Sequence, residues 1–533
     1  MKKKFSIIWV LLILIFAAFV YFYKLNDIPN GFYVDEAAVA YNAYSILQTG
    51  RDIFAQPYPI LFRLLGSYTP PLFIYFSVPI IYFFGMAPQV FRGISALSAL
   101  VSIIFFFLLT KRLKIFKSLP VLYLATFFYA ISPWLIFNAR LGYETTLAYL
   151  LFNVGVYFLF SALTSPKDFL RGSIFLSLAT YTAHTQRYLV PIFLSFYLLV
   201  FRKFIFRKEN IKYLKLSFLV ILLTQIPNIL VLSTPAFWVK NERLMGQPLG
   251  QILMDIINQA FIYLSPRNLF YELNDIDMQH TVPGISVIYN WMVIPYLIGV
   301  YLFFKNIKKV GFKFIALLFS VSLVPAVFSG QFISIQRALP LLLPLSVVIG
   351  LGIDYIWQKL RSKYAIPIFI LLSFYSLILL YRSYFVLFLK ERAIAWNYGY
   401  SQLTDFIKQN PGSNFVIDNS RNPRNYILLL YYLKYPPAMY QNEVSSIYKI
   451  DYYRSLPSED SYKFSNVEVR AIDWKTDPCR QQLLIGDEIS ISEGQAKEHE
   501  LIKVYELKDY QGRIIFQGFK TNPEKKCAKN IMI

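Results

Sequence analysis

The sequence is poor in charged residues, histidine and cysteine. Only 16% of its 533 residues are charged, and it contains 3 histidines and 2 cysteines. A soluble domain carries about 25% charged residues, so the composition excludes an ordinary soluble enzyme. Two cysteines are too few for a disulfide scaffold, and a hydrophobic content of 56% excludes disordered and collagenous chains.

Three common catalytic signatures are also missing. The sequence has no glycine-rich phosphate loop, no Ser/His/Asp set and no Cys-x-x-Cys pair. These absences argue against a nucleotide-driven pump, a hydrolase of the common type and a thiol redox enzyme.

Long apolar runs dominate what is present. They extend over roughly 16 to 24 residues and alternate with short basic loops, which is typical of membrane helices. The first run, residues 5–23, follows three lysines and ends in aromatic residues. We therefore expect an uncleaved signal anchor with a cytoplasmic N-terminus, rather than a cleaved signal peptide.

The positive charge is distributed unevenly. The net charge is +22, of which residues 390–533 contribute only +2. This asymmetry predicts a transmembrane domain at residues 1–389 and an extracytoplasmic α/β domain at residues 390–533. Because the basic residues lie between apolar runs, we expect them to face anionic lipid and not nucleic acid.

Five basic loops define a topology by the positive-inside rule. They lie at residues 111–117, 167–171, 202–215, 305–313 and 359–363. With the N-terminus inside, an even number of crossings must precede each inside loop. This parity predicts that run 173–201, which has inside loops at both ends, is two short helices with an outer turn. It also predicts that run 71–85, broken by Pro79, lies at or dips into the outer face. The expected fold is a polytopic α-helical membrane protein of about 11 spans, with the C-terminal domain outside. The alternative is that run 71–85 spans normally and one basic loop violates the rule.

Asp35 and Glu36 form the first candidate site, just after the first span. Carboxylates close to hydrocarbon are costly unless they are paired, so they are functional candidates. Such a carboxylate could take a proton from an incoming hydroxyl held within hydrogen-bond reach. The alternative is that Asp35 caps the following helix and Glu36 occupies its first turn.

Three arginines fall in separate outer turns. Guanidinium groups bind phosphate oxygens through a rigid bidentate fork, so this set suits an anionic ligand. Alternatively, an Arg/Glu pair fixes the first turn, and the other arginines snorkel to the interface. The candidate residues of these turns are Arg140, Tyr143, Glu144, His184, Gln186, Arg187 and Arg337.

His280 lies in a long outer loop beside Asp275 and Asp277. One histidine with scattered carboxylates is a weak metal set, so a substrate contact or a loop-stabilising role remains open and no metal ligand is assigned. Cys479 and Cys527 both fall in the predicted outer domain, where a disulfide is permitted; two free thiols are the alternative.

The sequence resembles the GT-C class of membrane glycosyltransferases, specifically the family 39 type that includes protein O-mannosyltransferases and lipid A aminoarabinose transferases. The resemblance covers roughly residues 5–400 and rests on the order and common side of several motifs. These are the Asp-Glu pair at 35–36, Tyr-Thr-Pro-Pro-Leu at 68–72, Phe-Gly-Met-Ala-Pro-Gln-Val-Phe-Arg at 84–92, Ser-Pro-Trp with Arg-Leu-Gly-Tyr-Glu at 132–144, Thr-Gln-Arg-Tyr at 185–188 and His-Thr-Val-Pro-Gly at 280–284.

This resemblance implies inverting transfer of a sugar from a polyprenyl-phosphate carrier to a hydroxyl acceptor on the outer face of the plasma membrane. Asp35 matches the family's general base, and Glu36 would hold the acceptor or tune Asp35. Arg140, with Arg187 and Arg337, would neutralise the leaving phosphate. No nucleotide is implied, and a divalent metal stays open.

The tail departs from the domains of the eukaryotic mannosyltransferases. Residues 414–418 predict a strand, residues 424–434 a helix, and residues 501–519 strands around a turn at Gln511 and Gly512.

Other functions predict different behaviour. A polysaccharide polymerase or ligase with a lipid-linked donor should survive Asp35→Asn but not loss of the outer arginines. A transporter or flippase should carry ionisable residues within its spans, which are almost free of charge here. A non-catalytic scaffold should be indifferent to both changes.

Overall fold

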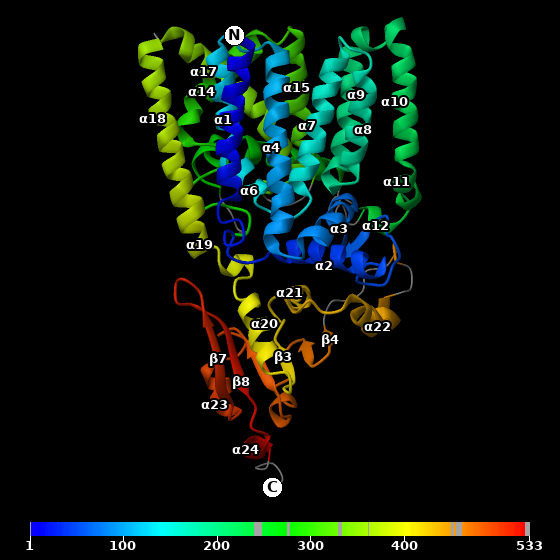
Figure 1. Ribbon diagram of the computed structural model, residues 1–533, viewed down its shortest axis with the longest axis vertical. Helices are drawn as coiled ribbons and strands as arrows, with labels where there is room; N and C mark the ends of the chain where they lie inside the picture. Colours follow the sequence, from blue (N-terminus) through cyan, green and yellow to red (C-terminus); the bar gives the residue numbers. More distant parts are fainter. Residues whose placement is uncertain are drawn as a thin grey trace. The chain divides into compact units, whose positions relative to one another are not determined.

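The computed structural model describes residues 2–238, 248–273, 278–328, 333–360, 362–448, 452–454 and 461–527. The chain divides into two compact units, drawn in Figure 1. The helical unit comprises Met1–Leu25, Thr69–Phe73 and Gln89–Val386, and the mixed unit comprises Asn26–Tyr68, Ile74–Pro88 and Leu387–Ile533. The sequence boundary expected at residue 389 therefore falls near one edge of the mixed unit, which also takes in the segment after the first helix.

The helical unit is built from apolar helices that pack along their lengths. α7 packs against α8, α8 against α9 and α10, and α17 against α5 and α14. Its helices are α1 (Lys2–Phe22), α4 (Pro88–Leu113), α5 (Leu119–Ala130), α6 (Pro133–Ala139), α7 (Thr145–Ala162), α8 (Asp168–Thr180), α9 (His184–Ile205), α10 (Ile211–Thr224), α11 (Ile226–Val231), α12 (Pro235–Trp238), α13 (Leu249–Leu264), α14 (Val293–Lys305), α15 (Val310–Ser322), α16 (Val324–Val327), α17 (Leu342–Lys359) and α18 (Ser362–Leu380).

Small residues allow α14 and α17 to approach closely. A Cβ at Gly299 would lie 2.0 Å from the carbonyl oxygen of Val348, and one at Gly352 would lie 1.8 Å from that of Pro295. Such close backbone contact stabilises helix pairs in lipid, where hydrophobic transfer supplies no driving force between helices.

Among the described residues, six helices are long and apolar enough to cross a membrane, or seven if the bent pair α5 and α6 counts as one span. Proline 133 opens α6, and the two helices meet at 49°. Other apolar helices are shorter, such as Asn290–Lys305. The predicted helical membrane fold is confirmed, whereas the predicted number of about 11 spans is not, because several apolar runs form short or broken helices.

Two predictions about individual runs concern their breaks. Run 173–201 does form two helices, α8 and α9, separated at residues 181–183. Run 71–85 forms α3 (Leu72–Phe84), a helix of 13 residues with Pro79 inside. At 1.5 Å per residue it measures about 20 Å, which is shorter than a hydrocarbon core of about 30 Å.

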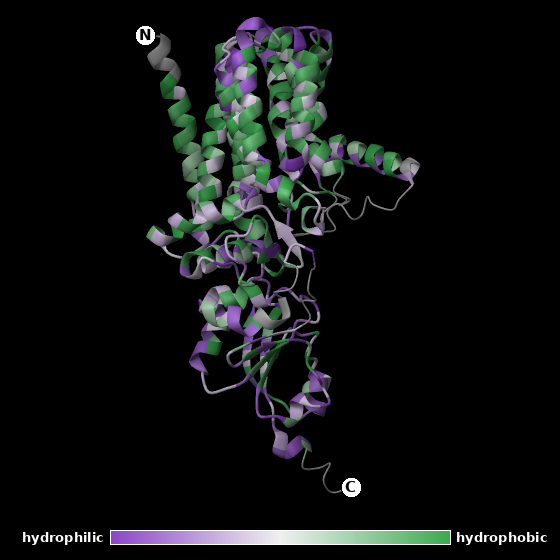
Figure 2. Cartoon of the chain, turned by 90° about the vertical axis from the view of Figure 1, so that its right-hand side faces the viewer, coloured by the Kyte–Doolittle hydropathy of each residue, from purple (hydrophilic) through white to green (hydrophobic). Residues whose placement is uncertain are grey.

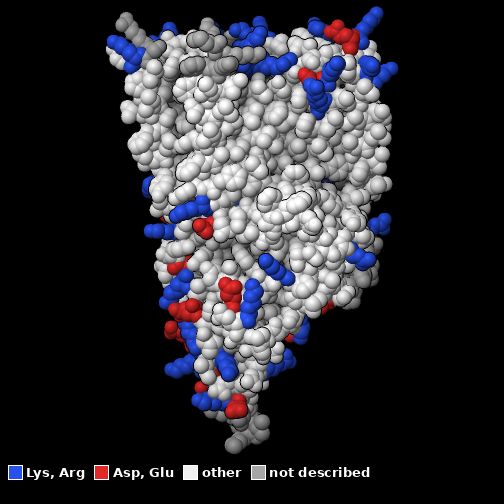
Figure 3. Space-filling model, in the orientation of Figure 1, with Lys and Arg blue, Asp and Glu red and all other residues white. Residues whose placement is uncertain are grey.

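Hydropathy and charge are segregated within the helical unit. Its helices are mostly hydrophobic along their length (Figure 2). Lysines and arginines gather at one end, where α4, α9 and α17 finish with basic last turns (Figure 3). We call this the basic end; α9 runs toward it, so the first turn of α9 lies at the opposite end.

The mixed unit contains a six-stranded sheet of order β4-β5-β3-β6-β8-β7. β3 pairs in parallel with β5 and β6, and the other pairs are antiparallel. The strands are β3 (Phe415–Ile417), β4 (Tyr462–Phe464), β5 (Val467–Val469), β6 (Leu483–Gly486), β7 (Ile502–Lys508) and β8 (Ile514–Lys520). The helices of this unit include α2 (Val34–Thr49), α20 (Tyr400–Gln409), α21 (Tyr426–Leu433), α22 (Pro437–Tyr448), α23 (Glu493–Glu498) and α24 (Pro523–Cys527).

The elements predicted for the tail are confirmed. β3, α21 and the β7–β8 hairpin coincide with the strand, helix and paired strands expected from the sequence. One face of the sheet packs Val416, Leu484 and Phe519 against Ile491. These strands are short and apolar on both faces near β3, as expected for a parallel pair that is covered on both sides.

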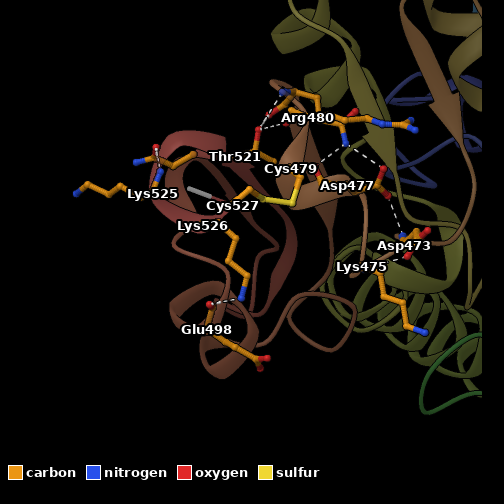
Figure 4. The surroundings of a disulfide bond; sticks show 12 residues. Asp473, Lys475, Asp477, Cys479, Arg480, Glu498, Thr521, Lys525, Lys526 and Cys527 are labelled. Carbon is orange, nitrogen blue, oxygen red and sulfur yellow. Dashed lines mark hydrogen bonds between the residues drawn. A yellow bond between two sulfur atoms is a disulfide. The ribbon is translucent and has the colours of Figure 1, made fainter. Parts of the chain in front are cut away.

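A disulfide closes the C-terminal end of this unit (Figure 4). It joins Cys479 to Cys527 with a Cα–Cα distance of 5.8 Å, so the possible pairing is confirmed. Arg470 binds the buried carboxylate of Asp477, two residues before Cys479, through two hydrogen bonds of 2.7 and 2.9 Å.

Candidate active site

Asp35 and Glu36 lie in the first turn of α2, in the mixed unit. The backbone N–H of Tyr33, the N-cap residue, donates to Glu36 Oε2 at 3.0 Å. Glu36 therefore makes the hydrogen bond that the third helical residue makes in a capping box. Glu36 is fully buried and Asp35 is half-buried. The capping role expected as the alternative therefore falls to Glu36 and not to Asp35.

α2 is held tightly by residues of the C-terminal segment within the same unit. A Cβ at Gly31 would lie 1.8 Å from the carbonyl oxygen of Trp396, so only glycine fits before the helix. The hydroxyl of Tyr41 donates to the carbonyl of Tyr435 at 2.8 Å. This contact on a buried face fixes the orientation of the helix that carries Asp35.

Gln441 on α22 forms a second attachment to α2. Its Nε2, which carries two hydrogens, lies within hydrogen-bond distance of three acceptors: Ser45 Oγ at 3.0 Å, Thr49 Oγ1 at 2.9 Å and the carbonyl of Asp52 at 2.9 Å. The end of α2 and the loop after it are thereby attached to the C-terminal segment.

A buried polar cluster that the sequence did not indicate follows α2. Asp52 is fully buried and accepts hydrogen bonds from the Tyr452 hydroxyl and from the backbone N–H groups of Phe54 and Gln56. Burial raises the pKa of Asp52 to about 6, although these hydrogen bonds and the nearby Arg63 oppose the shift. The Arg63 guanidinium donates to the Tyr452 carbonyl at 2.8 Å and lies 4.7 Å from the Tyr452 ring.

Arg140 is fully buried in the helical unit, immediately after α6. Its guanidinium donates to the carbonyls of Val20 and Tyr21 at 2.9 and 2.8 Å, and to that of Lys24 at 3.2 Å. Val20 and Tyr21 belong to the last turn of α1, where carbonyls need partners and a cation complements the helix dipole, and Lys24 follows that helix. Arg140 thus joins α6 to α1 in addition to any role toward a ligand.

Tyr143 and Arg337 belong to two turns that meet in the helical unit. Gln336 Nε2 donates to the Tyr143 hydroxyl, and Trp134 Nε1 donates to the carbonyl of Ile335 at 2.6 Å. Arg337 follows Gln336 directly, and burial lowers its pKa while the neighbouring Tyr263 opposes this shift. Glu144 occupies the N-cap position of α7, one residue after Tyr143. The structure therefore brings Tyr143 and Arg337, predicted separately, to one pair of turns.

His184, Gln186 and Arg187 lie in the first turn of α9 and not in the preceding turn. Arg187 is only 7% exposed, and among the described residues none of its three guanidinium nitrogens has a hydrogen-bond partner. Its guanidinium lies 4.8 Å from the ring of Phe237. Oε1 of the buried Gln186 likewise lacks a partner within the described part of the chain.

His280 is half-buried and begins the segment before α14. Its predicted neighbours Asp275 and Asp277 lie outside the described residues. Within the described ranges, no group of three or more His, Cys, Asp or Glu side chains could hold a metal ion. The structure therefore offers no described ligand set for a metal.

Comparisons with known proteins identify the fold. No protein-family model matches the sequence, and no curated protein matches it. Solved structures do match: ArnT from Cupriavidus metallidurans bound to undecaprenyl phosphate aligns with a TM-score of 0.55 and 14% identity, covering 96% of this chain and 98% of that one. The Archaeoglobus fulgidus oligosaccharyltransferase, in complex with zinc and sulfate, aligns with a TM-score of 0.51 and 12% identity, covering 96% and 73%.

A further structure of the Archaeoglobus oligosaccharyltransferase AglB holds an inhibitory peptide and a dolichol phosphate, and aligns with a TM-score of 0.50 and 12% identity over 95% of this chain and 74% of that one. These alignments cover nearly the whole chain. The protein has the GT-C fold of membrane glycosyltransferases, as its sequence motifs led us to expect.

Proposed function

We propose that this protein is an inverting glycosyltransferase that moves a sugar from a polyprenyl-phosphate donor to a hydroxyl acceptor. The fold supports this proposal, because ArnT was solved with undecaprenyl phosphate and AglB with dolichol phosphate. The acceptor is a hydroxyl of a protein, lipid or glycan. The donor carries its own leaving group, so the reaction needs no nucleotide.

The observation that carries the proposal is the buried guanidinium of Arg187, which has no hydrogen-bond partner among the described residues. An unpaired buried charge costs several kcal/mol, and we infer that a bound anion completes the hydrogen bonds of this group. Arg187 lies at the end of the helical unit opposite the basic loops. A phosphate monoanion or diester offers the paired oxygens that a guanidinium fork binds best.

Asp35 is proposed as the general base. It would accept the proton of the acceptor hydroxyl as that oxygen bonds to the anomeric carbon. The bond from this carbon to the phosphate oxygen breaks on the opposite face, which inverts the configuration and releases polyprenyl phosphate. Glu36 would hold the start of α2 in place through its bond to the Tyr33 N–H.

The arginines are proposed to stabilise the charge that develops on the leaving phosphate. We expect Arg187 to contribute most to this stabilisation. Arg337 is expected to contribute next, because it lies beside Tyr143 and Gln336. Arg140 already donates to three carbonyls of the α1 end, so its contribution is mainly to position that end. His184, Gln186, Glu144 and His280 are proposed as contacts to donor or acceptor.

The basic end of the helical unit is proposed to face the cytoplasm of a plasma-membrane protein. The first turn of α9 then opens to the outer side. The disulfide between Cys479 and Cys527 supports an oxidising, extracytoplasmic location for the C-terminal domain.

Turnover in lipid tests this function. Purified protein in liposomes is incubated with a panel of radiolabelled polyprenyl-phosphate sugars and a cell-envelope extract that supplies hydroxyl acceptors, and release of polyprenyl phosphate is measured. The proposal expects release with at least one donor. No release with any monophosphate donor, but chain extension with a lipid-linked oligosaccharide, would favour a polysaccharide polymerase or ligase instead.

A further inference from the structure

A large apolar groove lies between four helices of the helical unit, nearer its basic end. Side chains of α1, α5, α17 and α18 enclose a volume of about 940 Å³. This is near the upper limit of ligand pockets, which is about 1,000 Å³. Its wall combines aromatic rings, such as Trp9, Phe127 and Trp357, with aliphatic side chains, such as Leu12 and Ile370.

The wall of the groove suits hydrocarbon. Only Tyr123 and Ser373 add hydroxyl groups to it, and the Ser373 hydroxyl already donates to the carbonyl of Phe369 at 2.7 Å. The span that contains α18 is the most exposed of the candidate spans, with 22% of its apolar window buried. This apolar helix is therefore covered only in small part by protein.

Three lysines from two basic loops mark one end of the groove. Lys117 precedes the lining residues Leu119 and Pro120, Lys359 follows Trp357, and Lys363 precedes Ile366. All three are exposed, and none forms an ion pair with a described residue. A basic pocket between membrane helices is typical of a site for anionic lipid head groups.

The buried carboxylate of Asp354, on α17 three residues before Trp357, is already occupied. Asp354 accepts hydrogen bonds from the backbone N–H groups of Lys117 and Ser118 at 2.9 and 3.0 Å, and from Gln358 at 2.8 Å. Asp354 therefore fixes the two residues just before α5, and its oxygens are occupied by these donors and not by the lysine side chains.

We propose that this groove binds one anionic phospholipid of the membrane leaflet at the basic end. The acyl chains fill the space between α1 and α18, and the phosphate lies among Lys117, Lys359 and Lys363. The groove lies near the end of the helical unit opposite Arg187, so this site is separate from the proposed donor phosphate site. The lipid completes the packing of α18 and should stabilise the folded protein by mass action.

Native mass spectrometry tests the site. Detergent-solubilised full-length protein is equilibrated with equal amounts of phosphatidylglycerol and phosphatidylcholine, and the retained lipid is identified. We expect one retained phosphatidylglycerol. Replacing the three lysines by glutamine should reduce the preference over phosphatidylcholine by at least about tenfold, since each lysine near a lipid surface contributes about fivefold.

A matched pair of tryptophan variants tests the location. Ser373→Trp places a bulky ring in the groove, whereas Leu371→Trp changes a side chain of α18 that is 67% exposed and does not line the groove. Ser373→Trp should abolish retention and Leu371→Trp should not. Thermal unfolding of both variants in detergent, with and without phosphatidylglycerol, separates loss of the site from loss of fold.

Three results would overturn the proposal. One is equal retention of the two phospholipids by the wild type. Another is unchanged retention in Ser373→Trp. The third is displacement of phosphatidylglycerol by equimolar undecaprenyl phosphate, which would assign the groove to the carrier lipid.

Discussion

Arg187→Met separates a ligand-binding arginine from a structural one. In the free protein the guanidinium is buried and has no hydrogen-bond partner among the described residues, so burying it costs several kcal/mol. The contact of the guanidinium with the Phe237 ring at 4.8 Å stabilises the folded protein by about 0.5–2 kcal/mol. Replacement by an uncharged side chain of similar length should therefore leave the free energy of unfolding unchanged or raise it, by up to about 3 kcal/mol.

The same change should reduce turnover strongly. Removing one partner of a buried charge pair costs about 2–5 kcal/mol, which corresponds to a loss of roughly 30-fold to several thousand-fold in kcat/KM. Arg187→Lys keeps the charge without the bidentate fork, so an intermediate loss is expected. The assay is release of radiolabelled sugar from polyprenyl phosphate, with thermal unfolding measured on the same samples.

Arg171→Met is the matched control. The Arg171 side chain is 60% exposed and pairs with Asp168 at 2.9 Å, a contact worth about 0–1 kcal/mol. It should change neither turnover nor stability appreciably. A markedly less stable Arg187→Met with normal turnover per folded molecule would refute the reasoning and make Arg187 a structural residue.

Other predictions concern the mixed unit. The pKa of Asp52 is raised to about 6, so the folded state holds this proton more tightly than the unfolded state. The contribution of Asp52 to stability is therefore full below about pH 4 and declines by about 3 kcal/mol as the pH rises through 6. Asp52→Asn should flatten this part of the curve of stability against pH, and an unchanged curve would contradict the buried-carboxyl account. Cys479→Ala should destabilise this unit by about 2–4 kcal/mol, since the disulfide closes a loop of 48 residues. The loss of stability is measured by urea unfolding of the protein, with proteolysis used to follow the mixed unit. Equal stability of the oxidised and reduced proteins would argue against this prediction. Gly31→Ala should cost about 1–3 kcal/mol because its Cβ would lie 1.8 Å from the Trp396 carbonyl oxygen, and wild-type protease resistance of the α2 segment would show that the backbone shifts freely there.

Local patterns predicted much of the fold. The apolar runs indicated most of the membrane helices, and the break at residues 181–183 followed from basic loops on both sides of one long run. The apolar strand at 414–418 and the turn at Gln511 and Gly512 indicated β3 and the β7–β8 hairpin. These features depend on residues that are near one another in the chain, which a sequence displays directly.

The number of about 11 spans stays a prediction, because the same local patterns do not decide how each run bends. Ser132 and Pro133 interrupt one apolar run, and the resulting helices α5 and α6 meet at 49°. Hydropathy reports the apolar content of a run, whereas bending depends on how the freed backbone groups find other partners. A count based on runs therefore exceeds a count based on long helices.

The contacts of individual site residues depended on distant partners. Arg140 donates to carbonyls 116 to 120 residues earlier in the chain, and the hydroxyl of Tyr452 reaches Asp52 across 400 residues. No local spacing reveals such pairs. The sequence did identify Arg187 as a candidate, but only the structure shows that its guanidinium is buried without a hydrogen-bond partner among the described residues.

The most direct measurement of the central claim compares wild type with Asp35→Asn in a sugar-transfer assay. Both proteins are reconstituted in lipid with the same radiolabelled polyprenyl-phosphate sugar and the same cell-envelope extract as a source of hydroxyl acceptors, and release of polyprenyl phosphate is followed over time. Asp27→Asn, a change of an exposed carboxylate before α2, is the control. The account predicts turnover in the wild type and the control, and a loss of at least about 100-fold in Asp35→Asn. Equal turnover in all three proteins would contradict the assignment of Asp35 as the general base, and no turnover in any of them with any donor would contradict the transferase itself.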